Sequence, residues 1–359
     1  MLMDDTILLA TSKERLIEKL HILHEYCTSH GMSVNNSKTK FMVINGDPED
    51  REPIHLLDWI IEHCSKYVYL GAVFTADGST ASSLKAHLVS MKKHLNKLCI
   101  FMNTNKDIPF IAKRKVVEAA FNAAILYSCE SWLDTSFQMM NSMYMTAIKL
   151  LLGVRTSTPN NLCLAELGMP PLSALIKHKQ AMCIRKLIQT RRDIANDPFM
   201  FAFELTRTGN HRMYNHINSI LEGDTSLETA LSNLRANIQA SDKTKCVTYS
   251  HINPTYTIHE VYSNTGNIPE YIRLAFTRLR LSSHRLRIET GRWSRLAREQ
   301  RLCECGLVQD ECHVMCDCPR TQVLRTSYDK PVIFPKVLIE AKDINDFKFI
   351  YDVLKTYET

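Results

Sequence analysis

Two adjacent aspartates, Asp4 and Asp5, stand between short apolar runs at the start of the chain, which reads Met-Leu-Met-Asp-Asp-Thr-Ile-Leu-Leu-Ala. This pattern predicts a tight β-hairpin with the carboxylates at its turn. Mg²⁺ prefers one or two carboxylates together with phosphate oxygens of a substrate. Two such ions can clamp the attacking and leaving oxygens of a phosphoryl transfer. An Asp-Asp pair on its own is more often a solvated turn, so its meaning depends on the residues that follow.

A second concentration of metal-binding residue types lies near the other end of the chain. Five of the twelve cysteines fall within residues 303–318, which read Cys-Glu-Cys-Gly-Leu-Val-Gln-Asp-Glu-Cys-His-Val-Met-Cys-Asp-Cys. Four Cys and His side chains this close together can hold a structural, tetrahedral Zn²⁺. Such an ion supplies folding energy to a segment with little core of its own. The alternative is a set of reduced cysteines in a turn-rich tail.

Arginine is concentrated just before these cysteines. Between residues 273 and 301 only Glu289 and Glu299 oppose a run of arginines, which are Arg273, Arg278, Arg280, Arg285, Arg287, Arg292, Arg295, Arg298 and Arg301. Such a surplus suits a polyanion such as nucleic acid. A tryptophan among arginines can also stack a base while guanidinium groups hold phosphates. We therefore expect nucleic-acid contacts from Arg285, Arg287, Arg292, Trp293 and Arg298. The alternatives are a helix face paired with acidic groups elsewhere, and a core position for Trp293.

Length and composition are those of an ordinary globular protein. The chain has 359 residues, of which 45% are hydrophobic and 23% charged, and we expect two or three domains. The net charge of +6 is a mild excess. No run is apolar enough to span a bilayer, and no signal-peptide pattern opens the chain. We expect an intracellular protein of the cytoplasm or nucleus that is not secreted and has no membrane partner.

Hydrophobic periodicity predicts the elements that position these residues. A helix capped by Ser12 and ended by Gly31 follows the aspartates, and strands are expected at 39–45 and 67–74. Helical patterns are found at 79–103, 111–127, 136–152, 172–192, 268–301 and 344–355. A small β part before a large helical part predicts an α+β protein.

Three motifs in this order resemble those of reverse transcriptases. Residues 3–10 resemble the catalytic hairpin, and residues 31–40 (Gly-Met-Ser-Val-Asn-Asn-Ser-Lys-Thr-Lys) are similar to the glycine-asparagine-lysine turn that follows it. Tyr69-Leu70-Gly71 resembles the primer-grip hairpin. The best resemblance is to non-LTR (LINE-type, jockey-like) retrotransposons, since residues 129–132 (Cys-Glu-Ser-Trp) and the cysteine-rich tail also fit. The resemblance spans nearly the whole chain.

The resemblance implies an RNA-directed DNA polymerase, a nucleotidyltransferase with RNA and DNA as partners and Mg²⁺ as cofactor. Asp4 matches the first metal-binding aspartate of the catalytic pair, and Asp5 matches the second. Lys38 matches the lysine proposed to protonate the leaving pyrophosphate, and Lys40 is the nearby alternative. The stretch from Tyr69 to Gly71 would position the primer terminus, unless it is an ordinary strand ending in a turn.

The same resemblance implies a zinc knuckle in the tail. A Gly-Arg-Trp segment that precedes the family's knuckle is found here at residues 291–293. The match assigns the zinc ligands, which are Cys303, Cys305, His313 and Cys318. The first two are separated by one residue rather than two. Cys316 is an alternative to Cys318, and Cys312 is a spare.

The resemblance also suggests a division of the chain. It comprises a partial palm (1–78), a helical thumb and connection (79–205), an irregular linker-like segment (206–268), an Arg-rich helix with the knuckle (269–326) and a tail with a helix (327–359). Leu2 replaces the usual aromatic residue, and the family's other catalytic aspartate lies on a strand upstream of the hairpin. Only three residues precede Asp4, so we expect a missing upstream portion and no autonomous polymerase activity. The alternatives are a catalytically dead nucleic-acid-binding module and a non-functional relic with a helical fold.

Overall fold

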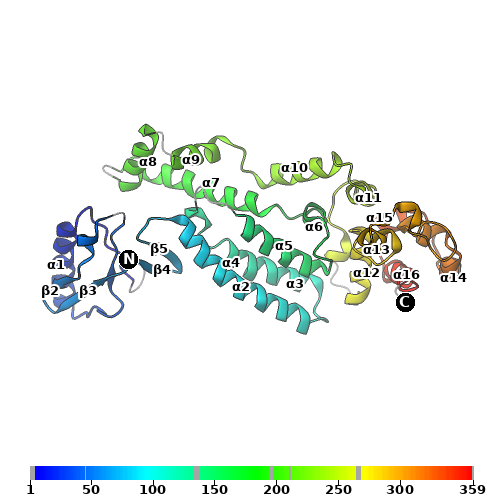
Figure 1. Ribbon diagram of the computed structural model, residues 1–359, viewed down its shortest axis with the longest axis horizontal. Coiled ribbons are helices and arrows are strands. Elements are labelled where there is room, and N and C mark those ends of the chain that lie inside the picture. The colour runs from blue at the N-terminus through cyan, green and yellow to red at the C-terminus, as the bar shows by residue number, and fades with distance from the viewer. Residues whose placement is uncertain are drawn as a thin grey trace. The chain divides into compact units, whose positions relative to one another are not determined.

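A computed structural model shows a mixed α+β protein that is 61% helical and has few, short strands (Figure 1). The predicted coarse fold class is therefore confirmed. The structure describes residues 5–44, 46–132, 137–194, 197–209, 212–263 and 268–357. The chain divides into two compact units, Met1–Val89 and Ser90–Thr359. In the described ranges, none of the helices combines the length and the apolar character needed to cross a membrane.

The first unit begins with helix α1 (Lys13–Ser29), as the sequence predicts. The Ser12 side chain accepts a hydrogen bond from the Arg15 backbone N–H and so caps the first turn. Gly31, with φ +63°, follows the last turn, where a residue without a Cβ avoids strain. Leu20 and Cys27 are the buried positions of the helix.

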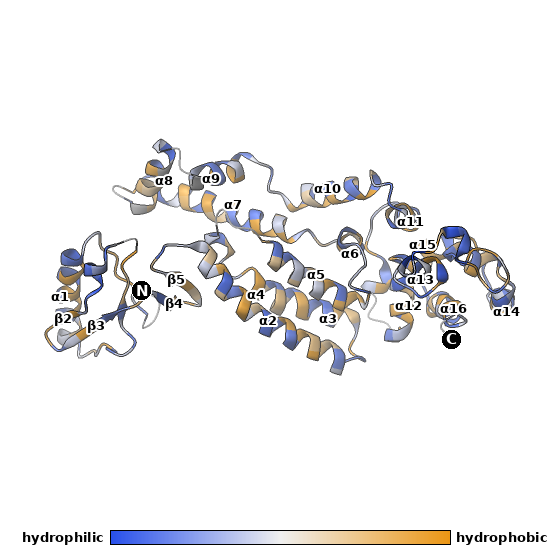
Figure 2. Cartoon of the chain, viewed as in Figure 1, coloured by the Kyte–Doolittle hydropathy of each residue, from blue (hydrophilic) through white to orange (hydrophobic). Residues whose placement is uncertain are grey.

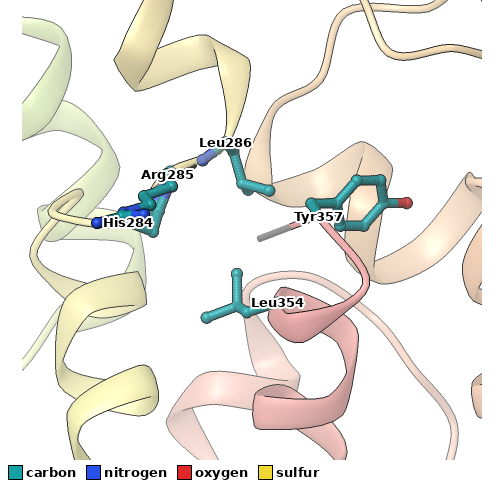
Figure 3. Close-up of a pocket in the computed structure, with 5 residues that line it drawn as sticks. All are labelled: His284, Arg285, Leu286, Leu354 and Tyr357. Carbon is teal, nitrogen blue, oxygen red and sulfur yellow. Dashed lines mark hydrogen bonds between the residues drawn. The ribbon is translucent and has the colours of Figure 1, made fainter. Parts of the chain in front are cut away.

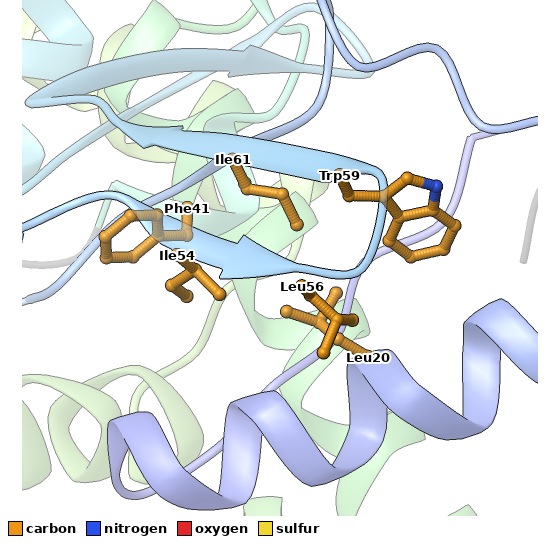
Figure 4. Packing of buried hydrophobic residues seen from close by; sticks show 6 residues of the cluster. All are labelled: Leu20, Phe41, Ile54, Leu56, Trp59 and Ile61. Atoms are coloured by element: carbon orange, nitrogen blue, oxygen red, sulfur yellow. The ribbon is translucent and has the colours of Figure 1, made fainter.

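A three-stranded sheet in the order β1-β3-β2 packs against α1. Strand β1 (Lys40–Phe41) pairs in parallel with β3 (Trp59–His63), and β2 (Ile54–Leu56) forms an antiparallel hairpin with β3. The three strands and α1 bury one apolar cluster, shown in Figure 4 and formed by Leu20, Phe41, Ile54, Leu56, Trp59 and Ile61. The strand expected at 39–45 is therefore shorter than predicted, and the β2–β3 hairpin was not predicted.

A second hairpin corrects the single strand predicted at 67–74. That segment forms two antiparallel strands, β4 (Lys66–Tyr69) and β5 (Ala72–Thr75). Leu70 and Gly71 make the turn between them with φ of 49° and 80°. Positive φ at both turn residues suits the right-handed twist of a two-residue hairpin. Residues 69–71 therefore lie at the turn of this hairpin.

A series of helices follows, which are α2 (Thr80–Thr104), α3 (Phe110–Val116), α4 (Ala123–Ile125), α5 (Gln138–Leu152), α6 (Asn160–Leu167) and α7 (Leu172–Arg191). All of them except α6, which was not predicted, lie within or close to the predicted helical ranges. A π-helical stretch, Val117–Asn122, joins α3 to α4. Gly153, with φ +67°, ends α5 as predicted. The Cys129 and Trp132 carbonyls accept hydrogen bonds from the buried Gln180 amide, so the segment at 129–132 serves core packing.

The segment expected to be irregular, 206–268, is largely helical in its described part. It contains the end of α8 (Pro198–Thr208), then α9 (Arg212–Glu222), α10 (Leu227–Gln239) and α11 (Thr244–Ile252). Figure 2 shows hydrophobic residues interspersed with hydrophilic ones along α10. Leu234 and Ile238, one turn apart, are the buried positions of α10. A narrow apolar stripe on polar helices explains why the composition suggested a linker.

The C-terminal region is built from short helices rather than the continuous helical stretch predicted at 268–301. Helix α12 (Glu270–Arg280) and helix α13 (Arg287–Trp293) are separated by a bend in which Ser282 has φ 46°. Further on come α14 (Gln322–Ser327), α15 (Lys336–Ile339) and α16 (Ile344–Lys355). Helix α16 matches its predicted range and packs along α12, with the rings of Phe276 and Phe347 5.0 Å apart.

Candidate metal centre and adjoining basic surface

The candidate catalytic residues of the first unit are not assembled into a site in the part of the chain that the structure describes. Asp4 lies outside the described residues, and Asp5 is exposed. In the described part of the predicted hairpin, Asp5 forms a single β-bridge and residues 6–10 form no strand. Lys38 is exposed, while the Lys40 ammonium lies 2.5 Å from the Glu62 carboxylate.

The turn that carries Lys38 is nevertheless well defined. The backbone N–H groups of Lys38 and Thr39 donate to the Asn35 carbonyl at 3.1 and 2.9 Å. The Tyr67 hydroxyl of β4 donates to the Lys38 carbonyl at 3.1 Å, so the lysine turn and the second hairpin are joined directly. Beside this hairpin lies a shallow groove of about 400 Å³, lined by Lys66, Thr75, Ser82, Lys85, Ala86 and Val89.

One group of Cys and His side chains among the described residues has the geometry of a metal centre. The side-chain ligand atoms of Cys303, Cys305, His313 and Cys318 all lie within 4.8 Å of one another. The Cys303 and Cys318 sulfurs are 3.7 Å apart, and the Cys305 sulfur is 3.1 Å from His313 Nε2. A tetrahedron with Zn–S bonds of about 2.3 Å places its sulfurs about 3.7–3.8 Å apart. The predicted ligand set can therefore hold a metal such as zinc.

A minimal hairpin presents the first two ligands. Leu302 and Val308 form an isolated β-bridge, and the Cys303 N–H donates to the Leu307 carbonyl at 2.7 Å. Inside it, the Gly306 N–H donates to the Cys303 carbonyl at 2.9 Å, and Gly306 has φ +89°. A glycine adopts this φ without a Cβ clash. The tight turn brings Cys303 and Cys305 to one site although a single residue separates them.

The other two ligands flank a π-helical turn, His313–Asp317, which begins at His313 and is followed directly by Cys318. The Asp310 carboxylate accepts the His313 backbone N–H at 3.0 Å, and the Cys318 N–H donates to the His313 carbonyl at 2.9 Å. Cys312 and Cys316 do not belong to the four-residue group. The alternative in which Cys316 replaces Cys318 is therefore not the arrangement found.

The thiols differ in their ionisation. Burial by itself would raise the pKa of the Cys303 thiol, but the Cys305 backbone N–H and the His313 side chain outweigh it and lower that pKa to about 6. Burial raises the pKa of Cys312 to about 11 and also raises that of Cys316. A hydrogen bond from the Leu307 backbone N–H lowers the pKa of the Cys305 thiol, but burial and the Cys303 side chain outweigh it and raise that pKa. Because metals bind thiolates, Cys303 is the ligand of this group that is best prepared to bind one.

The segment of the candidate metal centre is hydrogen-bonded to helix α13 through Gln309, a buried residue that the sequence did not single out. Its side-chain oxygen accepts the Arg287 N–H at 2.7 Å, and its carbonyl accepts the Ile288 N–H at 3.1 Å. The buried His284 and Glu311 side chains meet at 2.9 Å and add a second link to the bend before α13. These contacts hold the start of α13 against the segment that carries the four candidate ligands.

Most arginines of the basic run have partners inside the fold. Arg280 pairs with Glu166, Arg273 with Glu270, Arg292 with Glu289 and Arg298 with Asp310. Arg278 and Arg301 donate to backbone carbonyls. The alternative of charges paired elsewhere thus holds for most of the run, including the expected contacts Arg292 and Arg298. Among the expected contacts, Arg285 and Arg287 are exposed and form no ion pair with a described residue.

Trp293 is 57% exposed at the end of α13, which excludes the core position considered for it. The Arg155 guanidinium carbon lies 4.0 Å from the centre of its ring. Arg155 comes from the loop after α5 and was not predicted, because nothing in its local sequence marks it. Burial lowers the pKa of Arg155, and nearby Arg285 and Arg278 lower it further.

A small cavity lies beside this surface, lined by His284, Arg285, Leu286, Leu354 and Tyr357 (Figure 3). Its volume is about 10 Å³. A single water needs about 10–15 Å³, so the cavity admits no organic ligand.

Comparisons of the chain with protein-family models, with curated proteins and with solved structures found no match.

Proposed function

We propose that the chain is part of a non-LTR retrotransposon reverse transcriptase whose C-terminal region binds RNA or DNA and is stabilised by Zn²⁺. The observation that carries the proposal is the convergence of Cys303, Cys305, His313 and Cys318, the same four residues that the family resemblance assigns as ligands. In this proposal Asp4 and Asp5 bind Mg²⁺, Lys38 acts at the leaving pyrophosphate, and residues 69–71 position the primer.

Two further observations support a nucleic-acid-binding role for the C-terminal region. Gln309 connects the metal centre to α13, at whose ends lie the unpaired Arg287 and the exposed Trp293. Cationic groups without carboxylate partners suit phosphates, and an exposed indole suits a base. Zinc binding would therefore organise the surface that holds the nucleic acid.

The second candidate function is a catalytically inactive nucleic-acid-binding module of the same origin. It is favoured because Asp5 is exposed and belongs to no metal-binding group in the described part of the first unit. A two-metal reaction needs several carboxylates at one place. The C-terminal surface would keep its role in either case.

We expect nucleic-acid binding to depend on the zinc ligands. The wild-type chain should bind a short RNA strand with an affinity that falls steeply as salt rises, because binding cations releases counterions from phosphates. The Cys303→Ser variant, which loses a ligand, should bind about tenfold or more weakly, in line with the usual effect of disturbing a metal site. Filter binding at several salt concentrations measures both effects. Cys312→Ser is the matched control, and equal RNA affinity of Cys303→Ser and wild type contradicts a zinc-organised surface.

Primer extension separates the two candidate functions. With an RNA template, a DNA primer, deoxynucleotides and Mg²⁺, we expect no extension by this chain alone, since carboxylates beyond Asp4 and Asp5 are needed for two-metal chemistry. Extension that disappears in Asp4→Asn would establish the polymerase directly and remove the inactive module from consideration.

A further inference from the structure

The Trp293 side chain is exposed to solvent and is also held in place by a neighbouring side chain. It is 57% exposed, whereas the chain's other two tryptophans, Trp59 and Trp132, are 5% and 3% exposed. One face of its ring is covered by the Arg155 guanidinium at 4.0 Å. Among the described residues, no second ring or cation stacks on it. A large apolar ring is thus held in place and still open to a partner.

Arg155 is itself fixed by contacts to the bend before α13. Its backbone N–H donates to the Ser283 hydroxyl at 3.0 Å, and the Arg278 guanidinium donates to the Gly153 carbonyl at 2.9 Å. These bonds hold the loop after α5 against the C-terminal region, although the residues they join lie more than a hundred positions apart in the chain. The stacking of Arg155 on Trp293 therefore belongs to a fixed arrangement.

Positive charge gathers around this ring. Arg285 and Arg278 are close enough to Arg155 to lower its pKa, and Glu289 is the carboxylate that offsets them. Glu289 is already shared by Lys245 at 2.6 Å and Arg292 at 3.0 Å. Several cations thus compete for one buried acid. Holding like charges together costs free energy, and an anionic ligand would recover it.

We propose that Trp293, backed by Arg155, is a stacking platform for an unpaired base of a single-stranded nucleic acid, with the surrounding arginines facing its phosphates. The inference rests on the proposed function and deepens it by naming the form of nucleic acid. A base within a duplex is stacked on both sides and cannot reach an indole without unstacking. A single strand offers a free base face beside its phosphates, which matches one open ring face next to cations.

The test uses the full-length, zinc-loaded chain and its intrinsic fluorescence. Because Trp59 and Trp132 are buried, quenching by an added oligothymidylate or oligouridylate reports on Trp293. We expect both strands to quench the emission and to bind more tightly than a duplex of the same length. Trp293→Leu should weaken single-strand binding about tenfold, as expected for losing one stacked base, while Trp293→Phe should keep most of the affinity. Arg155→Ala should weaken binding several-fold, and Arg235→Ala, which removes an exposed arginine from α10, is the matched control.

The possible results distinguish a failure of nucleic-acid binding from a failure of base stacking on Trp293. If the wild type binds no nucleic acid at all, the proposed function and this inference both fail. If it binds nucleic acid but Trp293→Leu binds single strands equally well, or the duplex binds better, only the stacking platform is refuted. Equal binding of polyglutamate would instead identify a general site for acidic chains. Unchanged zinc content and melting temperature of the variants confirm that the fold is intact.

Discussion

Removing zinc, or replacing Cys303 with serine, is expected to lower the melting temperature of the chain by about 10 °C. Free zinc at about a thousand times its dissociation constant stabilises the folded state by about 4 kcal/mol. For a unit of this size, each kcal/mol shifts the midpoint by about 2–4 °C. Thermal unfolding followed by circular dichroism, with added zinc and with a chelator, measures the difference.

Two other cysteines of the same segment provide control variants for Cys303→Ser. Cys312 and Cys316 lie among the ligands in sequence but outside the four-residue group, so Cys312→Ser and Cys316→Ser should keep one zinc per chain and the full stabilisation. Cys318→Ser should behave like Cys303→Ser. Loss of zinc from Cys316→Ser together with its retention in Cys318→Ser would show that the other ligand assignment is the correct one.

The candidate metal centre could be predicted from the sequence because its ligands are local. Six Cys and His residues lie within residues 303–318, and the family resemblance selected the same four that the structure brings together. Helices α1 and α16 were predicted for a similar reason, since caps and periodicity act within a few residues. The β2–β3 hairpin was missed because its turn, Leu57-Asp58, lacks the glycine that usually marks such turns, although Leu57 does adopt a φ of 53°.

The partners of the arginines in residues 273–301 could not all be predicted from the sequence. Counting charges between residues 273 and 301 suggested a surface of free arginines, but most of them have partners. Some partners are near in sequence, such as Glu270 for Arg273, and others are far away. Arg278 reaches Gly153, and Arg280 reaches Glu166, both more than a hundred residues upstream. For the same reason Arg155 went unnoticed as the partner of Trp293. Which charges are buried is decided by tertiary packing, and no spacing rule encodes it.

Replacing Glu166, the partner of Arg280, with glutamine is also expected to cause a large loss of stability. Glu166 of α6 and Arg280 of α12 are 0% and 2% exposed, and they form a two-pronged pair at 2.6 and 3.1 Å. The Tyr262 and Tyr249 hydroxyls donate to the same carboxylate at 2.8 and 2.9 Å. Every strong acceptor position of the buried carboxylate is thus used, and the network ties four separate segments together.

Glu166→Gln should therefore lower the free energy of unfolding by about 3–5 kcal/mol, because it leaves the Arg280 cation buried without a counter-charge. Urea unfolding at neutral pH measures the loss. Glu340→Gln, which breaks the exposed Lys336–Glu340 pair on α15, is the matched control and should have little effect.

The pH dependence of stability provides an independent test of the Glu166–Arg280 pair. Burial would raise the pKa of Glu166, but Arg280 and the two tyrosine hydroxyls outweigh burial and hold that pKa below its usual value. The folded state thus binds the proton less tightly than the unfolded state. The pair's stabilisation is present above the unfolded-state pKa and is lost as pH falls through the folded-state pKa. Wild type should lose stability in acid more steeply than Glu166→Gln, which has no carboxylate at this position to titrate.

A double variant separates the energy of the pair from the cost of an orphaned charge. Glu166→Leu combined with Arg280→Met removes both charges, and apolar replacement of a buried ion pair is often close to neutral. The double variant should therefore be more stable than Glu166→Gln, even though more atoms have changed. Part of the loss of stability should remain, because the Tyr249 and Tyr262 hydroxyls no longer have their acceptor. Each buried polar group left unsatisfied costs about 1–3 kcal/mol. A double variant less stable than Glu166→Gln would mean that the ion pair itself, and not the avoidance of an unpaired charge, stabilises this core.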